Sequence, residues 1–312
     1  MTRRYYKAMA GRKQEFLPLC LSDGFVGVDF DVDTDLSGSF TDEWHDFNKV
    51  IIPLIKKFQP EKTKIGAGLA GGCIWRIGKG IRTGDIVLCP NGEKELHIGE
   101  VSGDYFYVPG QPLQHRRKVT WFEERIPRND LSTDFKNALG AGLSVICIDD
   151  HGSEIENFLG GNSKPVTLTT NDESIEDPAV FALEKYLEEF LISNWDKTQL
   201  SKKYDIYSED GQTVGQQYET DTGRIDILAI SKDHKELLVI ELKKGRASDK
   251  VVGQIQTYMG YLIEEFVEEG QTVKGLIIAL EDDPKIRRAL VVAKGIDFYR
   301  YEVDFRLIPI SS

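Results

Sequence analysis

The stretch that decides the fold of this chain is Gly223-Arg224-Ile225-Asp226-Ile227-Leu228-Ala229-Ile230, followed after a short turn by Leu237-Leu238-Val239-Ile240-Glu241-Leu242-Lys243. Both segments are apolar runs with the length of a buried strand, and the short connection predicts a β-hairpin. Charged side chains interrupt them at Asp226, Glu241 and Lys243. Alternate residues of a strand share a face, so Glu241 and Lys243 point the same way. Burying such charges for packing alone is costly, which indicates a functional role.

Clustered carboxylates with a nearby ammonium group suit one kind of chemistry. Carboxylate oxygens are the ligands that a hard cation such as Mg²⁺ prefers. A bound metal polarises a phosphate and lowers the pKa of a water molecule. Lys243 would then orient that water or neutralise charge on the phosphate. The plainer alternative is that Asp226 begins a turn and Glu241 forms an exposed ion pair with Lys243.

The rest of the C-terminal half predicts alternating helices and strands. Asp177 and Pro178 form a helix start, with the proline in the first turn. Leu183, Leu187, Phe190 and Leu191 would form its buried stripe. This order predicts an α/β domain with a mixed central sheet flanked by helices. The expected strands are 213–218, 224–230, 236–242, 273–280 and 296–303, and the expected further helices are 248–268 and 284–292.

The N-terminal half predicts a mostly β domain, because short apolar runs alternate with glycine-rich breaks. Its expected helices are 43–58 and 131–139. Its expected strands are 24–30, 73–77, 85–89, 97–101, 105–108, 119–121 and 143–148.

The length of 312 residues suggests two domains. A polar, turn-forming stretch lies between the two halves. We therefore predict a target-recognition domain over residues 1–155, a linker over 156–177 and a second domain over 178–312.

Composition excludes several classes of protein. The net charge of −12 argues against a general nucleic-acid coat but not against a nuclease, because binding charge can be local. No apolar run approaches the roughly 18–20 residues that span a membrane, and no signal-peptide pattern follows the basic start. The cysteines do not have zinc-site or disulfide spacing, so we expect reduced thiols in a cytoplasmic protein. They are Cys20, Cys73, Cys89 and Cys147.

The hairpin resembles a known nuclease signature. Asp226 with Glu241-Leu242-Lys243 resembles the PD-(D/E)xK motif of the restriction-endonuclease-like fold. Residues Gly223–Gly260 are similar to the C-terminal catalytic domain of the NucS-type mismatch endonucleases, and the resemblance extends over about residues 178–307. Ile225 stands where the motif has proline, a departure that is common in this branch.

The helix after the hairpin extends the resemblance. Gln254-Ile255-Gln256-Thr257-Tyr258 matches the QxxxY pattern of the RecB-like branch. Gln254 and Tyr258 are four residues apart and so share a helix face, with Lys250 one turn earlier. The alternatives are core packing for Tyr258 and plain solvent exposure for Gln254.

The resemblance implies a role for each matching residue. Mg²⁺, with Mn²⁺ as a substitute, would be the cofactor, and Glu188 on the preceding helix would be an outer-sphere ligand. The implied metal-binding residues are Asp226, Glu241, Leu242 through its carbonyl, and Glu188. The implied catalytic residues are Asp226, Glu241, Lys243 and Gln254. Candidates for DNA contact are Arg224, Lys244, Arg246, Lys250 and Tyr258, and a solvated turn is the alternative for the basic ones.

Part of the N-terminal half mixes aromatic and basic residues. Aromatic rings stack on unpaired or flipped bases, while Arg and Lys bind phosphates. Core packing and a solvated face are the alternatives. The candidate base pocket is Trp75, Tyr105, Tyr107 and Trp121, and the candidate phosphate contacts are Arg116, Arg117 and Lys118. Residues 81–88, 99–105 and 115–119 resemble the PUA/EVE-like barrels of modification-dependent restriction nucleases.

Two other patterns carry little weight. Residues 66–71 fit GxGxxG, but no strand pattern precedes them and no helix pattern follows. Asp29, Asp31, Asp33 and Asp35 alternate as in a calcium loop, yet the required glycine and final glutamate are missing.

The sequence therefore favours a Mg²⁺-dependent DNA endonuclease that acts in restriction or phage defence. The N-terminal domain would recognise modified or special double-stranded DNA, and a homodimer would make double-strand cuts. The alternatives are a catalytically inactive nuclease-fold subunit that binds nucleic acid or regulates a partner, a mismatch- or structure-specific nuclease, and an RNA-directed nuclease.

Overall fold

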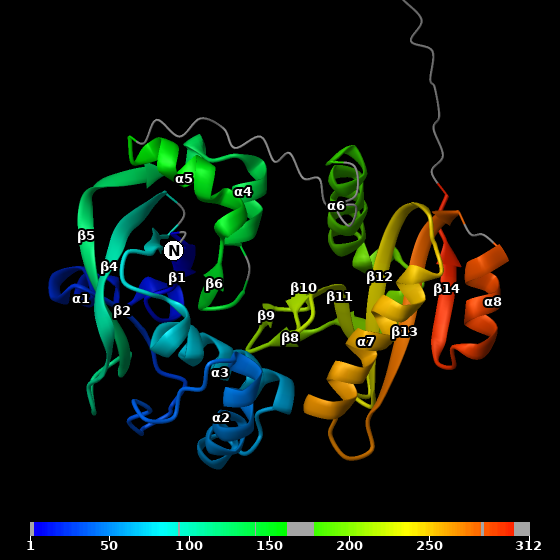
Figure 1. Ribbon diagram of the computed structural model, residues 1–312, viewed down its shortest axis with the longest axis horizontal. Coiled ribbons are helices and arrows are strands. Elements are labelled where there is room, and N and C mark those ends of the chain that lie inside the picture. The colour runs from blue at the N-terminus through cyan, green and yellow to red at the C-terminus, as the bar shows by residue number, and fades with distance from the viewer. Residues whose placement is uncertain (1–2, 93, 141, 161–177, 282–283, 303–312) are drawn as a thin grey trace, which may run out of the picture. The chain divides into compact units, whose positions relative to one another are not determined.

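The structure is a computed structural model that describes residues 3–92, 94–140, 142–160, 178–281 and 284–302 (Figure 1). The chain divides into two compact units, Met1–Thr169 and Thr170–Ser312. No helix in the described ranges is both long enough and apolar enough to span a bilayer. All four cysteines are free thiols.

The N-terminal unit is built on a six-stranded sheet with the order β2-β5-β4-β3-β1-β6. β1 pairs with β3 in parallel, and the other pairs are antiparallel, so the sheet is mixed. The described strands form an open path, and no barrel is present among them. The strands are β1 (Tyr5–Ala8), β2 (Phe25–Val28), β3 (Ile86–Asn91), β4 (Glu95–Tyr107), β5 (His115–Pro127) and β6 (Val145–Cys147).

Helices cover both faces of this sheet, so the unit is a mixed α/β structure rather than the mostly β domain predicted from the sequence. On β3, Val87 belongs to the core that includes α2 and α3, whereas Ile86 and Leu88 belong to the core that includes α4 and α5. A strand buried on both faces reads as a continuous apolar run. The helices are α1 (Leu17–Asp23), α2 (Trp44–Phe58), α3 (Lys64–Trp75), α4 (Thr133–Leu139) and α5 (Gly152–Phe158).

Helix α3 corrects two predictions. The expected strand 73–77 is the end of α3 and the turn of π-helix after it, and the GxGxxG stretch lies inside α3. Glycine disfavours a helix interior, so its density concealed the helix. Packing explains Gly71, because a Cβ there would lie 2.5 Å from Ile51 Cγ2 on α2. The glycine allows the two helices to approach closely.

The C-terminal unit has the predicted mixed sheet, with the order β10-β11-β12-β13-β14 and with β7 paired to β11. β10, β11 and β12 are antiparallel, and β12, β13 and β14 are parallel. Its elements are α6 (Pro178–Ser193), β7 (Tyr204–Ile206), β8 (Ser208–Glu209), β9 (Gln212–Thr213), β10 (Gln216–Glu219), β11 (Arg224–Ser231), β12 (Glu236–Arg246), α7 (Lys250–Glu265), β13 (Thr272–Glu281), α8 (Pro284–Val292) and β14 (Ile296–Arg300).

Helices α6 and α7 lie on opposite faces of this sheet (Figure 1). Ile227, Ile240 and Leu242 pack with residues of α6 on one face. On the other face, a Cβ on Gly275 of β13 would meet Ile255 and Met259 of α7. We call this second face the α7 face. Phe190 of α6 is 64% exposed, so it does not belong to the buried stripe predicted for that helix.

The predicted linker of residues 156–177 overlaps the end of α5. Residues 161–177 lie outside the described residues, so the linker and the domain boundaries drawn from it stay predictions.

A buried lysine gives a stability prediction for the N-terminal unit. Lys7 of β1 is 1% exposed, and its Nζ donates to the Leu139 carbonyl at the end of α4. Burial lowers the pKa of Lys7 from 10.5 to about 8. Between these values the unfolded chain binds more protons than the folded chain, so this group makes stability rise with pH.

We expect Lys7→Met to remove that rise. Relative to wild type, the free energy of unfolding of the variant should fall by about 1–3 kcal/mol between pH 7 and pH 10. Urea unfolding of both proteins at pH 7, 8.5 and 10 measures this difference. The other groups titrate in both proteins, so their contributions to the difference cancel. The prediction would be contradicted if the difference in free energy of unfolding between wild type and Lys7→Met did not change with pH.

Candidate functional site

The structure brings Asp226, Glu241 and Lys243 to one end of the C-terminal sheet. The antiparallel register of β11 and β12 runs from Ile230–Leu237 to Ile227–Ile240. Continuing it by one residue places Asp226 opposite Glu241. Cross-strand neighbours share a face, and Glu241 and Lys243 follow Val239 at intervals of two. Val239 pairs with Gly275, so the three charged residues belong to the α7 face.

Asp226 is held by the backbone of the next strand. Its Oδ2 accepts a hydrogen bond of 2.7 Å from the Leu242 N–H. If the ladder continued, Leu242 would stand opposite Ile225 and its N–H would donate to a backbone carbonyl of β11. The Asp226 carboxylate takes the place of that carbonyl where the register ends. The N–H and C=O of one strand residue point to the same neighbour, so the Leu242 carbonyl also points toward β11.

Helix α7 adds an amide and a phenol to the same face. Tyr258 is 5% exposed, and the exposed Gln254 donates from Nε2 to its hydroxyl over 3.3 Å. Burial raises the pKa of Tyr258, and the charges of Glu241 and Asp226 raise it further. Glu241 itself is 1% exposed. Tyr258 is therefore an internal contact of this site rather than a surface group.

Glu188 reaches the site from α6. It is 6% exposed, and its two oxygens accept hydrogen bonds from Gln216 at 2.7 Å and from Gln217 at 2.5 Å. Burial raises the pKa of Glu188 to about 7, and the nearby charge of Asp226 adds to the shift. Sequence reasoning did not identify either glutamine. Neighbouring residues of a regular strand point to opposite faces, so nothing in the pattern predicted that both would contact one carboxylate.

The residues at this sheet end can supply a divalent cation with hard oxygen ligands. Asp226, Glu241 and the Leu242 carbonyl form the donor set that Mg²⁺ prefers. Each carboxylate oxygen has two lone pairs, so a bond from the Leu242 N–H does not exclude a cation from Asp226. Within the described residues, no group of three or more His, Cys, Asp and Glu side chains could hold a metal ion. The candidate donor set is smaller than such a group, because it consists of two carboxylates and one backbone carbonyl.

The predicted basic contacts of this unit have different surroundings. Arg224 is exposed, with an ion pair of 3.6 Å to Glu219. Lys250 is exposed at the start of α7, and Lys244 is partly buried. The side chain of Arg246 lies outside the described residues. Contact of these residues with DNA stays a prediction.

In the N-terminal unit, Arg116 and Arg117 point inward. Arg116 is 5% exposed, and its guanidinium donates to the carbonyls of Pro112 and Leu113. Arg117 is 6% exposed, and its guanidinium donates to two carbonyls of the π-helical turn after α3. The structure therefore brings neither guanidinium to the surface, where a phosphate would bind. Lys118 is exposed.

The two candidate tryptophans are also tied to the interior. Trp75 donates from Nε1 to the Thr41 carbonyl at 3.0 Å, and Trp121 donates to the Cys20 carbonyl at 2.8 Å. Both rings pack against the apolar core on the face of α2 and α3.

The two candidate tyrosines lie beside a buried histidine. The Tyr105 hydroxyl is 2.9 Å from His115 Nδ1, and the Tyr107 ring centroid is 5.3 Å from that of His115. The Tyr107 hydroxyl contacts Asp33 Oδ1 at 3.1 Å and Gln114 Oε1 at 2.8 Å. A role for these rings in binding a base stays a prediction.

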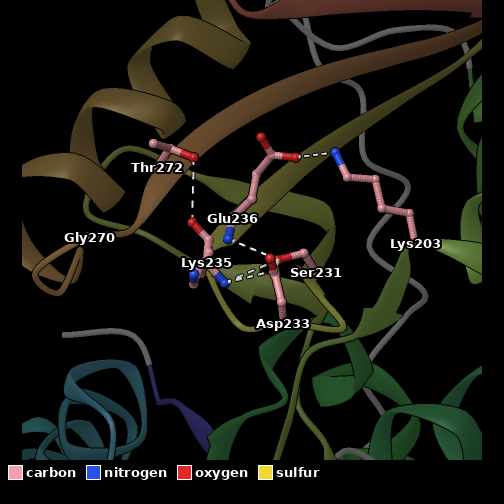
Figure 2. Close-up of a pocket in the computed structure, with 7 residues that line it drawn as sticks. All are labelled: Lys203, Ser231, Asp233, Lys235, Glu236, Gly270 and Thr272. Carbon is pink, nitrogen blue, oxygen red and sulfur yellow. Dashed lines mark hydrogen bonds and ion pairs between the residues drawn. The ribbon is translucent and has the colours of Figure 1, made fainter.

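A surface pocket of about 240 Å³ lies at the opposite end of β12 (Figure 2). Glu236 stands five residues before Glu241, which corresponds to roughly 16 Å of strand. Its carboxylate is paired with Lys203 at 2.7 Å and Lys274 at 3.3 Å. The pocket is therefore separate from the site formed by Asp226, Glu241 and Lys243. Its lining consists of Lys203, Ser231, Asp233, Lys235, Glu236, Gly270 and Thr272.

Comparison with known families identifies the two parts of the chain separately. Residues 197–306 match the family model described as the endonuclease NucS C-terminal domain. Residues 6–141 match a domain of unknown function (DUF8426). The chain thus carries a NucS C-terminal endonuclease domain, of the PD-(D/E)xK family, after an N-terminal domain of unknown nature. No curated protein matches the chain.

Solved structures give only distant similarity. A repair endonuclease from Pyrococcus abyssi is 16% identical with a TM-score of 0.30, over 67% of this chain and 62% of that one. The EndoMS–dsDNA2 complex is 16% identical with a TM-score of 0.32, over 71% and 66%. EndoMS in its apo form is 17% identical with a TM-score of 0.30, over 70% and 65%. This chain spans less than two thirds of their length, and scores this low carry no structural argument.

The contact between α7 and the start of β11 gives a testable prediction. Gly223 has a φ of 158°, and a Cβ there would lie 2.5 Å from the Tyr258 hydroxyl oxygen. We expect Gly223→Ala to lower the free energy of unfolding by about 1–3 kcal/mol, through backbone strain at this φ and through overpacking against the Tyr258 hydroxyl. Tyr258→Phe removes the colliding oxygen, so the double variant should lose less than Gly223→Ala alone.

Urea unfolding of the wild type, both single variants and the double variant forms a double-mutant cycle. The expected coupling is favourable and at least about 0.5 kcal/mol. Strictly additive losses would show that the methyl group added by Gly223→Ala does not meet the hydroxyl.

Proposed function

We propose that this chain is a Mg²⁺-dependent DNA endonuclease whose C-terminal unit hydrolyses phosphodiester bonds. The observation that carries the proposal is the row at one end of the sheet, where the register of β11 and β12, continued by one residue, puts Asp226 opposite Glu241 and Lys243 shares their face. The match of residues 197–306 to the endonuclease NucS C-terminal domain supports it independently.

Each residue of the row has a role that follows from its chemistry. Asp226, Glu241 and the Leu242 carbonyl would hold the divalent cation. When bound, the cation lowers the pKa of a water molecule and offsets charge on the phosphate. The ammonium of Lys243 donates to a phosphate oxygen and stabilises the charge that develops there. The exposed Gln254 amide orients the attacking water.

Hydrolysis then proceeds by in-line displacement at phosphorus. The water oxygen forms the new P–O bond, and the bond to the bridging oxygen of the leaving strand breaks. The leaving oxygen gains a proton from solvent, while the proton lost by the attacking water goes to solvent. One site cuts one strand, so we propose a homodimer for double-strand cleavage.

The N-terminal unit would select the target. It is compact and has its own sheet, which supports a division between recognition and cutting. We propose that it recognises modified or otherwise special double-stranded DNA, in restriction or phage defence. Lys118 is its remaining candidate for phosphate contact, since Arg116 and Arg117 are buried.

A second candidate is a repair nuclease that acts on mismatched or branched DNA. The family match of the C-terminal unit favours it, because the matched model is that of NucS. The two candidates share the cutting site and differ only in the DNA that the N-terminal unit selects.

Cleavage of matched DNA substrates separates these candidates. The substrates are plasmids without modification, plasmids with modified cytosine, and mismatched or branched duplexes, each incubated with Mg²⁺ or Mn²⁺. We expect preferential cutting of modified plasmid and loss of cutting in EDTA. Preference for mismatched or branched duplexes would instead support the repair candidate. Cleavage that persists in EDTA would contradict a metal-dependent mechanism.

Three substitutions test the catalytic row. We expect Asp226→Asn, Glu241→Ala and Lys243→Ala each to lower kcat about 100-fold or more, because each removes a group that stabilises the transition state. Lys232→Ala is the matched control, since Lys232 is exposed in the turn of the same hairpin and pairs with Asp205. Full activity of Asp226→Asn or Lys243→Ala would overturn the assignment.

Calorimetric titration with Mn²⁺ distinguishes an enzyme from an inactive scaffold. An active site should bind the ion in the wild type and lose it in Glu241→Ala. A folded wild-type protein that neither binds Mn²⁺ nor cuts any substrate would point to the scaffold.

A further inference from the structure

Gln217 of β10 bridges two carboxylates that come from different elements. Its Nε2 donates to Glu188 Oε2 of α6 at 2.5 Å and lies 3.4 Å from Asp226 Oδ1 of β11. An amide nitrogen carries two hydrogens, so it can donate to both oxygens at once. A neutral donor placed between two carboxylates offsets part of their mutual repulsion.

The sheet register places Gln217 in the same row as the catalytic carboxylates. In the pairing of β10 with β11, Gln216 stands opposite Ile227 and Tyr218 stands opposite Ile225. Gln217 therefore falls opposite Asp226 on one side, as Glu241 does on the other. Asp226 is thus flanked by donors from both neighbouring strands, the Leu242 N–H of β12 and the Gln217 amide of β10.

The backbone at Gln217 is strained. Its φ is 48°, in the left-handed region that side chains other than glycine rarely adopt. Such a conformation is unfavourable and persists only where the surrounding structure holds it. In a regular strand Gln216 and Gln217 would point to opposite faces, yet both contact Glu188. The left-handed turn lets both amides reach one carboxylate.

We infer that Gln217 is a positioning residue of the cutting site, which fixes the orientation of the Asp226 carboxylate and couples it to Glu188. The inference rests on the proposed nuclease function. Gln217 contacts neither phosphate nor water in this role. It acts through Asp226, so that one oxygen stays bound to the Leu242 N–H and the carboxylate plane is set for a cation.

Substitution at position 217 should impair the chemical step more than DNA binding. We expect Gln217→Ala to lower kcat at least tenfold while KM for DNA changes less than twofold. Apparent affinity for Mn²⁺, measured by calorimetry without DNA, should fall at least threefold. A residue that only stabilises the fold would change melting temperature without this division between kcat and KM.

Three further variants separate the side chain from the backbone and from Glu188. Gln217→Gly removes the amide but relieves the left-handed strain, so it should lose as much kcat as Gln217→Ala without a larger loss of stability. Gln216→Ala removes a donor to Glu188 and none to Asp226, so its loss of kcat should be smaller. Gln256→Ala, at an exposed position of α7, is the matched glutamine control and should behave as wild type.

The outcomes distinguish this inference from the proposed function. If Glu241→Ala is inactive while Gln217→Ala has wild-type kcat and Mn²⁺ affinity, the inference is wrong and the nuclease assignment stands. If Glu241→Ala cuts as fast as wild type, the catalytic row itself is wrong. If the wild type cuts no substrate, calorimetry decides alone, and equal Mn²⁺ affinity of wild type and Gln217→Ala overturns the inference.

Discussion

The hydrogen bond from the Leu242 N–H to the Asp226 carboxylate is the contact on which the site depends. It lies where the β11–β12 ladder ends, so a side chain takes over from the backbone at that point. The strands can then separate while Leu242 keeps a partner for its buried N–H. The same bond fixes Asp226 opposite Glu241 and turns the Leu242 carbonyl toward β11. The Asp226 carboxylate therefore takes the place of a backbone carbonyl at the point where the pairing of β11 with β12 ends.

The sequence carries enough information to predict most of the C-terminal unit. Its strands are apolar runs that the core requires, so the charges at Asp226 and Glu241 stand out against them. In both units, features that depend on contacts between residues far apart in the sequence are harder to predict. In the N-terminal unit, Gly71 reads as a helix breaker until Ile51 of α2 is placed against it. In the C-terminal unit, Gln217 reads as an ordinary exposed strand residue until its backbone turns left-handed beside Glu188.

Basic residues illustrate the same limit of sequence reasoning. A run such as Arg116-Arg117-Lys118 shows charge but not burial. In the structure the two guanidinium groups satisfy backbone carbonyls that lie inside the unit, and Lys7 does the same at the end of α4. A buried carbonyl without a donor is expensive, so a long cationic side chain is one way to satisfy it. These cations stabilise the interior of the N-terminal unit, and their charge is not available to attract a ligand.

Two glutamates of the C-terminal unit show how the partner of a carboxylate decides what it can do. Partial burial alone would raise the pKa of Glu236, but hydrogen bonds from Lys203, Tyr204 and Lys274 lower it instead. Glu188 is buried, yet the donors that hold it are the neutral amides of Gln216 and Gln217, and its pKa rises to about 7. A carboxylate already paired with ammonium groups gains little from another cation. Burial and the charge of Asp226 disfavour the ionised form of Glu188, and its amide partners add no positive charge that would offset this. Neutral donors thus order Glu188 beside Asp226 without neutralising it, whereas the ammonium groups around Glu236 stabilise its charged form.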